Sequence, residues 1–152
     1  MIHALETLLT DTPAPHVLLV TLNRPEVSNA FNTAMAHDLI TLFESVALDT
    51  GEIRAIVLTG AGTRAFCAGG DLKERDGMSD AAWGAQHLVY ERMVRAVLGC
   101  PVPTIGAING AKIGSASKSP ASASFDFVTA TPNDRQVWLD DHAKRLGEQI
   151  DR

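Results

Sequence analysis

The chain has 152 residues, 45% of them hydrophobic and 20% charged, which indicates one folded globular domain with a core and excludes a disordered chain. A formal net charge of -5 argues against a nucleic-acid partner, because nucleic acids require a basic face. The two cysteines lack metal-ligand spacing, and neither a secretory signal nor an apolar run of about 20 residues is present, so we expect a cytoplasmic protein without a metal or a membrane segment.

The amino-terminal part predicts a β-hairpin. Residues 4–9 and 16–22 are mainly apolar, and the second run is also rich in β-branched side chains, which favours two strands. The prolines of segment 11–15 indicate an exposed turn between them. Pro25 ends the second strand, because proline cannot donate a hydrogen bond to a neighbouring strand.

A helix is predicted after this hairpin. Its apolar positions recur with helical spacing, and either Asn32 or Thr33 can cap its first turn. The periodic positions are Met35, Leu39, Leu42, Phe43 and Val46. One apolar face on a helix of this length predicts packing against a sheet.

The segment 64–72 is glycine-rich and follows a predicted central strand at residues 54–59. In α/β folds the carboxyl ends of parallel strands are where ligands bind. Gly69 and Gly70 have no side chains, so their backbone N–H groups could approach a ligand oxygen closely. The alternative is an ordinary turn that uses glycine only for its geometry.

A second helix and a third strand follow. Residues 73–80 carry mixed charges, which indicates a solvated helix start and a lid-like loop. Trp83, Tyr90, Val94 and Val97 predict the buried stripe of a helix over residues 80–98, and we expect His87 to share the face of Tyr90. Residues 102–108 predict a further central strand, so the whole pattern favours a layered α/β domain with parallel strands.

Three blocks of the sequence resemble the enoyl-CoA hydratase/isomerase (crotonase) family. They are residues 21–32, 65–72 and 101–110, and their order and spacing resemble the family from about residue 16 to 114. The resemblance implies an α/β fold of the family's ββα spiral type, incomplete at the carboxyl terminus. It also implies an acyl-CoA thioester as substrate, no cofactor other than that coenzyme A, and a homo-oligomer built as a trimer or paired trimers.

The same resemblance implies a site made of backbone amides. In the family two N–H groups stabilise the enolate oxygen of the thioester, and these map onto Gly70 and Ser115. The resemblance further implies a set of substrate-binding residues: Ser28, Ala30, Phe31, Ala68, Gly69, Gly70, Asp71, Leu72 and Gly114.

The sequence departs from the family pattern after about residue 114. Lys118 stands where the hydratases have their first catalytic glutamate, and the second glutamate has no counterpart. Residues 125–133 again resemble the family's next strand, whereas residues 134–152 do not resemble the family. We therefore expect a partial core domain over 1–133 and a polar, helical or disordered tail over 134–152. A frameshift is our hypothesis for both departures, and a nucleotide sequence without a family-like frame beneath residues 134–152 would contradict it.

Three functions follow from these observations. The first is an enzyme that hydrates or isomerises acyl-CoA thioesters, with the choice between the two reactions open. The second is a catalytically inactive, truncated relative that binds a CoA thioester or pairs with full-length subunits. Serine hydrolysis, with Ser115 or Ser117 as nucleophile, is disfavoured because no histidine follows in a matching context.

Overall fold

The computed structural model describes residues 5–112 and 125–129. Within these ranges the helices are the 3-10 helix η1 (Pro25–Val27) and the α-helices α1 (Thr33–Leu48), α2 (Leu72–Arg75) and α3 (Asp80–Leu98). The strands are β1 (Leu8–Ala14), β2 (Val17–Leu22), β3 (Ala55–Gly60), β4 (Ala65–Cys67), β5 (Thr104–Ile108), β6 (Ala111–Lys112) and β7 (Phe125–Thr129).

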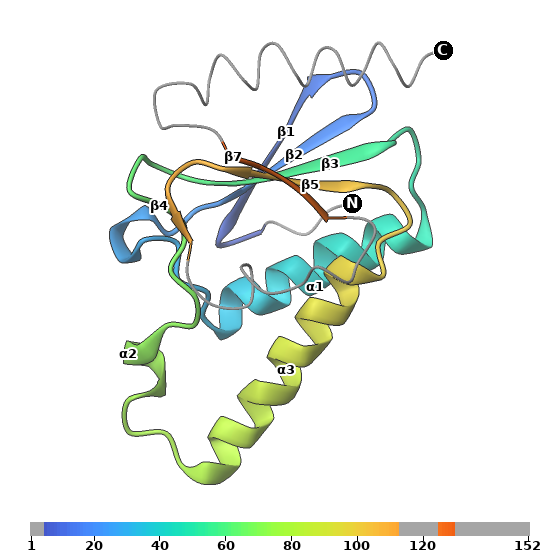
Figure 1. Cartoon of the computed structure of the whole chain (residues 1–152). Helices are drawn as coiled ribbons and strands as arrows, with labels where there is room; N and C mark the ends of the chain where they lie inside the picture. The colour runs from blue at the N-terminus through green and yellow to red at the C-terminus, as the bar shows by residue number, and fades with distance from the viewer. Residues whose placement is uncertain (1–4, 113–124, 130–152) are drawn as a thin grey trace.

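The main sheet has five strands in the order β1-β2-β3-β5-β7. In this sheet the β1–β2 pair is antiparallel, whereas β2, β3, β5 and β7 run parallel to one another. The expected parallel α/β architecture is therefore confirmed. Since the parallel strands end at one edge of the sheet, the segments after β2, β3 and β5 converge there. A second, two-stranded sheet of β4 and β6 lies just beyond β3 (Figure 1).

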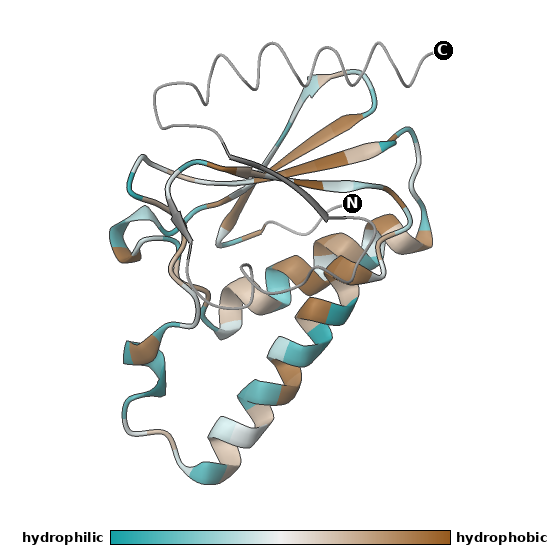
Figure 2. Cartoon of the chain, viewed as in Figure 1, coloured by the Kyte–Doolittle hydropathy of each residue, from teal (hydrophilic) through white to brown (hydrophobic). Residues whose placement is uncertain are grey.

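Helix α1 lies against one face of the main sheet, and α3 packs on α1 and extends away from the sheet (Figure 1). Strand β2 alternates, so that Leu18, Val20 and Leu22 belong to the core between the sheet and these helices, whereas Val17 belongs to a smaller cluster on the opposite face. Hydrophobic residues accordingly concentrate in the central strands (Figure 2). The predicted apolar positions of α1 are all buried, which confirms that this helix packs on the sheet.

The ends of the long helices follow the capping signals in the sequence. Asn32 caps α1, because its side-chain oxygen accepts a hydrogen bond from the Met35 amide at 2.9 Å. Ser79 caps α3 in the same way through the Ala82 amide at 3.2 Å, and Gly99 follows the last helical residue, so α3 spans the predicted residues 80–98.

The hairpin prediction was wrong in its boundaries. Strand β1 extends from Leu8 to Ala14, so residues 11–14 form strand where a turn was expected. The turn is confined to Pro15 and His16, and His16 adopts a left-handed φ of 63°. Pro13 is tolerated because β1 is the edge strand of the described sheet, where a missing N–H donor costs no ladder hydrogen bond.

The predicted stripe of α3 was wrong at three positions. Trp83 is 47% exposed, Val94 is 37% exposed, and His87 is exposed instead of sharing the face of Tyr90. The buried residues of α3 are Gln86, Tyr90 and Met93. The stripe is displaced because Gln86, a polar residue, is held inward by hydrogen bonds to neighbouring side chains.

Strand β7 (Phe125–Thr129) is the part of the carboxyl-terminal segment that the structure describes. Strand β7 pairs in parallel with β5 from Thr104↔Phe125 to Ile108↔Thr129, so a strand forms at the start of segment 125–133, as expected. The tail over 134–152, together with Gly114, Ser115 and Lys118, lies outside the described residues. No helix within residues 5–112 and 125–129 is long and apolar enough to cross a membrane.

Candidate functional site

The site is built where the segment after β2 meets the glycine-rich loop after β4. Three backbone hydrogen bonds join them: Ala68 N to Ser28 O at 3.0 Å, Phe31 N to Gly69 O at 2.9 Å, and Asp71 N to Phe31 O at 3.0 Å. These bonds bring together residues that lie about 40 positions apart in the sequence. Most of the predicted substrate-binding residues thus come from two segments that touch.

Asn29 fixes the shape of the first segment. Its side chain is fully buried, accepts from the Arg24 amide at 3.0 Å, and donates to the carbonyls of Ala61 and Ala65 at 2.9 Å each. Ser28 and Asn29 both adopt left-handed φ angles, of 56° and 54°. Asparagine tolerates this conformation better than most residues, so the turn costs little backbone strain here.

The backbone amide of Gly70 lies outside the hydrogen bonds that join the two segments. The hydrogen bonds of the Phe31–Gly70 bridge use the carbonyl of Gly69 and the amide of Asp71, and leave the Gly70 N–H outside the bridge. Within residues 5–112 and 125–129 no acceptor pairs with that N–H. Gly69 precedes it with φ of +89°, a conformation that favours glycine. The loop therefore holds one backbone donor that has no acceptor in the described part of the chain.

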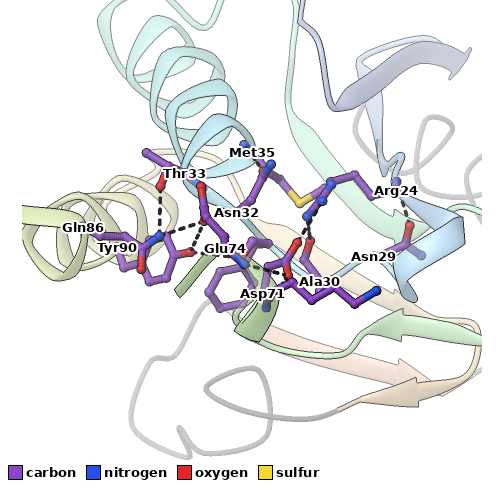
Figure 3. A network of polar contacts seen from close by, with 12 residues as sticks. Arg24, Asn29, Ala30, Asn32, Thr33, Met35, Asp71, Glu74, Gln86 and Tyr90 are labelled. Carbon is purple, nitrogen blue, oxygen red and sulfur yellow. Dashed lines mark hydrogen bonds and ion pairs between the residues drawn. The ribbon is translucent and has the colours of Figure 1, made fainter. Parts of the chain in front are cut away.

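An ion pair between Arg24 and Asp71 holds the end of the loop. Arg24 Nη2 lies 2.9 Å from Asp71 Oδ2, and Arg24 Nη1 donates to the Ala30 carbonyl (Figure 3). Asp71 also caps α2 by accepting from the amides of Lys73 and Glu74. Burial by itself would raise the pKa of the Asp71 carboxyl, but these hydrogen bonds and the Arg24 charge outweigh it and lower that pKa.

Glu74 ties α1, α2 and α3 together on the other side of the loop. Its carboxylate accepts from the Thr33 amide at 2.9 Å and from Gln86 Nε2 at 2.8 Å, and Tyr90 Oη lies 3.4 Å away (Figure 3). Tyr90 Oη also donates to the Phe31 carbonyl at 3.0 Å. Burial, followed by the charge of Glu74, raises the pKa of Tyr90 to about 12. Tyr90 is therefore a neutral donor that positions Phe31, as expected of a core tyrosine with a hydrogen bond.

A shallow pocket of about 220 Å³ lies beside the first segment. It is lined by Pro25, Ser28, Asn29 and residues 61–65. Of the predicted substrate-binding residues only Ser28 lines it. The pocket is therefore adjacent to the loop of Gly70 rather than part of it.

The predicted site residues fall into three groups. Ser28 and Phe31 bond to the loop of residues 68–71, and the Ala30 carbonyl accepts from Arg24, which pairs with Asp71. Leu72 is 77% exposed at the start of α2. Gly114 and Ser115 belong to the part of the chain that the structure does not describe. Of the two predicted backbone amides, the structure therefore describes the position of the Gly70 amide and not that of the Ser115 amide.

Sequence reasoning missed the polar partners of the loop. Arg24, Glu74 and Gln86 were not identified from the sequence, although Asp71 with a glutamate three positions later, Glu74, is a readable capping signal. Pairs such as Arg24 with Asp71 are 47 residues apart, so no local pattern could have found them. Within the described residues no group of three or more His, Cys, Asp or Glu side chains could hold a metal ion.

Known proteins similar to this chain share one family. The sequence model of the enoyl-CoA hydratase/isomerase family matches residues 14–119. An enoyl-CoA hydratase of Rhodobacter capsulatus is 40% identical over 112 residues, covering 74% of this chain and 41% of the relative. The mitochondrial Delta(3,5)-Delta(2,4)-dienoyl-CoA isomerase of Rattus norvegicus is 34% identical over 123 residues, covering 74% and 37%.

Solved structures agree with these relatives. The enoyl-CoA hydratase of Bacillus anthracis superposes with a TM-score of 0.66 at 34% identity, covering 69% of this chain and 40% of that protein. AtuE of Pseudomonas aeruginosa gives a TM-score of 0.64 at 34% identity, covering 70% and 41%. This chain thus spans about 40% of the length of the relatives it matches, and the incomplete crotonase-like fold expected from the sequence is confirmed. The match of sequence model, relatives and fold shows that the chain belongs to the enoyl-CoA hydratase/isomerase family.

Proposed function

We propose that this chain binds an acyl-CoA thioester and directs the thioester oxygen at the backbone amide of Gly70. The observation that carries the proposal is the Gly70 N–H, which has no acceptor among the described residues and lies in a loop held from both sides. Such a preorganised donor stabilises negative charge on an oxygen without having to reorganise during the reaction. Family membership supplies the substrate class.

The second donor of the proposal is the Ser115 amide. Formation of an enolate next to the thioester puts negative charge on one oxygen, and two donors stabilise that charge better than one. Ser28, Ala30 and Phe31, with the loop at residues 68–71, would line the channel for coenzyme A. Their support is the contact between the two segments described above.

A second candidate function is thioester binding without turnover. Lys118 stands where the first catalytic glutamate of the hydratases is expected, and a protonated lysine is not a base. Loss of general acid–base catalysis costs about 10² to 10⁴-fold for each group. We therefore expect hydration and isomerisation close to the background rate, with binding retained.

The proposal is tested by calorimetric titration of the full chain with an enoyl-CoA thioester, and by following loss of the conjugated thioester absorbance. The expected result is saturable binding without turnover. Replacement of Gly70 by glycolic acid, introduced by chemical ligation at Cys67, removes only the N–H donor. The affinity for the thioester should then fall about 3 to 10-fold, which corresponds to the loss of one neutral hydrogen bond.

Gly70→Ala is the matched control. A Cβ there would lie 3.7 Å or more from its neighbours, Arg75 and Tyr90, so alanine fits and keeps the amide. Because it keeps the N–H, it should bind the thioester more tightly than the glycolic acid variant. Absence of any thioester binding would contradict the proposal, and turnover at about 1 s⁻¹ or faster would contradict the inactive alternative.

A further inference from the structure

Arg75 extends from the end of α2 across to α3. Its Nε donates to Gln86 Oε1 at 3.0 Å, and its guanidinium carbon lies 5.3 Å from the ring centre of Tyr90 and 5.9 Å from that of Trp83. Cation–π contacts of this kind hold a guanidinium in place without neutralising its charge. The head group of Arg75 is therefore fixed on three sides.

The guanidinium faces Gly70. A Cβ built on Gly70 would lie 3.7 Å from both Cζ and Nη2 of Arg75, which is ordinary van der Waals contact. Gly70 is also the residue whose amide we assign to the thioester oxygen. The positive charge of Arg75 thus lies beside the place where the acyl part of a bound thioester begins.

Three other arginines within residues 5–112 pair with a carboxylate, whereas Arg75 does not. Arg24 pairs with Asp71, Arg92 with Glu44, and Arg95 with Glu91. No carboxylate within residues 5–112 and 125–129 lies within 4.0 Å of the Arg75 guanidinium.

The carboxylate of Glu74, the residue before Arg75, already accepts hydrogen bonds from other groups. Glu74 directs its oxygens at the Thr33 amide, Gln86 and Tyr90. The Nη atoms of Arg75 have no acceptor in the described part of the chain. A half-buried guanidinium with two unused donor groups is suited to bind a carboxylate through paired hydrogen bonds.

We propose that Arg75 selects acyl-CoA thioesters whose acyl chain carries a second, anionic oxygen group, namely a carboxylate a few bonds from the thioester carbon. This inference rests on the proposed function, because it takes Gly70 as the position of the thioester. It goes further by naming the substrate class: monothioesters of dicarboxylic acids rather than simple fatty acyl thioesters.

The test compares three probes by calorimetric titration of the full chain. They are pent-2-enoyl-CoA, its carboxylate-ended counterpart 4-carboxybut-2-enoyl-CoA, and free coenzyme A. The carboxylate-ended thioester should bind about tenfold more tightly than the methyl-ended one, as expected for hydrogen bonds to a charged group. Fluorescence of Trp83, which lies against Arg75, gives a second readout of the same binding.

Three variants separate recognition from structure. Arg75→Met should reduce the tenfold preference to about onefold while leaving the affinity for the methyl-ended thioester unchanged. Arg75→Lys keeps the charge without the planar fork, so it should retain part of the preference and preserve the fold. Arg95→Met is the control, because it removes an equal charge from an 81% exposed side chain on the outside of α3.

The outcomes are distinct. Equal binding of the two thioesters to the unchanged chain overturns this inference and leaves the proposed function standing. Equal weakening of all three probes by Arg75→Met also overturns it, since Arg75 would then contact a phosphate of coenzyme A. Failure of both thioesters to bind overturns the proposed function, and this inference with it.

Discussion

Replacing Asn29 by alanine tests whether the turn after β2 is held by one buried amide. The Asn29 side chain is 0% exposed and makes three hydrogen bonds, one from the Arg24 amide and two to the carbonyls of Ala61 and Ala65. A net contribution of about 1 kcal/mol for each bond gives a loss of about 3 kcal/mol. Alanine must also keep φ near 54°, which costs about 1 kcal/mol more. The expected total is about 4 kcal/mol of the free energy of unfolding.

This loss is large beside the whole stability of a small domain, about 5 to 15 kcal/mol. Urea unfolding followed by far-ultraviolet circular dichroism measures it, provided that the slope of the transition is unchanged. Asn29→Gly is the matched control, since glycine loses the same hydrogen bonds but adopts a left-handed φ without strain. The glycine variant should therefore be about 1 kcal/mol more stable than the alanine variant.

Two results would refute this reasoning. A loss below about 1 kcal/mol in Asn29→Ala would show that the three hydrogen bonds do not hold the turn. Equal stability of the alanine and glycine variants would show that the left-handed conformation carries no strain.

The remaining predictions concern pH and glycine. Because the folded-state pKa of Asp71 is lowered, its carboxylate contributes to stability above about pH 4, and this contribution is lost as the pH falls further. The urea midpoint of Asp71→Asn should therefore depend less on pH between about 5 and 2 than the midpoint of the unchanged chain. An equal dependence would contradict this prediction. Because the folded-state pKa of Tyr90 is raised to about 12, its hydroxyl contributes to stability below about pH 10, and this contribution is lost between about pH 10 and pH 12. In the same urea titration Tyr90→Phe should lack this loss of stability at alkaline pH. Gly60→Ala should cost about 2 kcal/mol or more in urea unfolding, because its Cβ would overlap the Phe66 carbonyl oxygen. Gly84→Ala should instead raise the free energy of unfolding by about 0.5 to 1 kcal/mol, because a Cβ at this position of α3 would have no atom within 4 Å. Equal effects of the two substitutions would refute both predictions.

Elements whose signals are local were predicted well. The apolar spacing and the Asn32 cap placed α1, and the apolar run before Gly60 placed β3 within one residue at each end. The turn of the hairpin was misplaced because Pro13 was taken as a turn signal, whereas an edge strand accepts proline. On α3 the choice of Trp83 over Gln86 as a buried position followed hydrophobicity, which the polar network around Glu74 overrides.

The sequence alone determined the run of strands and helices and the loop that carries Gly70, because periodicity, capping and turn residues act over a few positions of the chain. The family followed from the resemblance of three sequence blocks. Only the tertiary structure decided which side chains meet: Arg24 with Asp71, Phe31 with the glycine loop, and Arg75 with Gly70 and two aromatic rings. About 40 residues or more of sequence separate Arg24 from Asp71 and Phe31 from the glycine loop. Arg75 belongs to α2, whereas the two rings that it contacts belong to α3. A local pattern holds no record of such contacts, since they depend on how whole elements pack on the sheet.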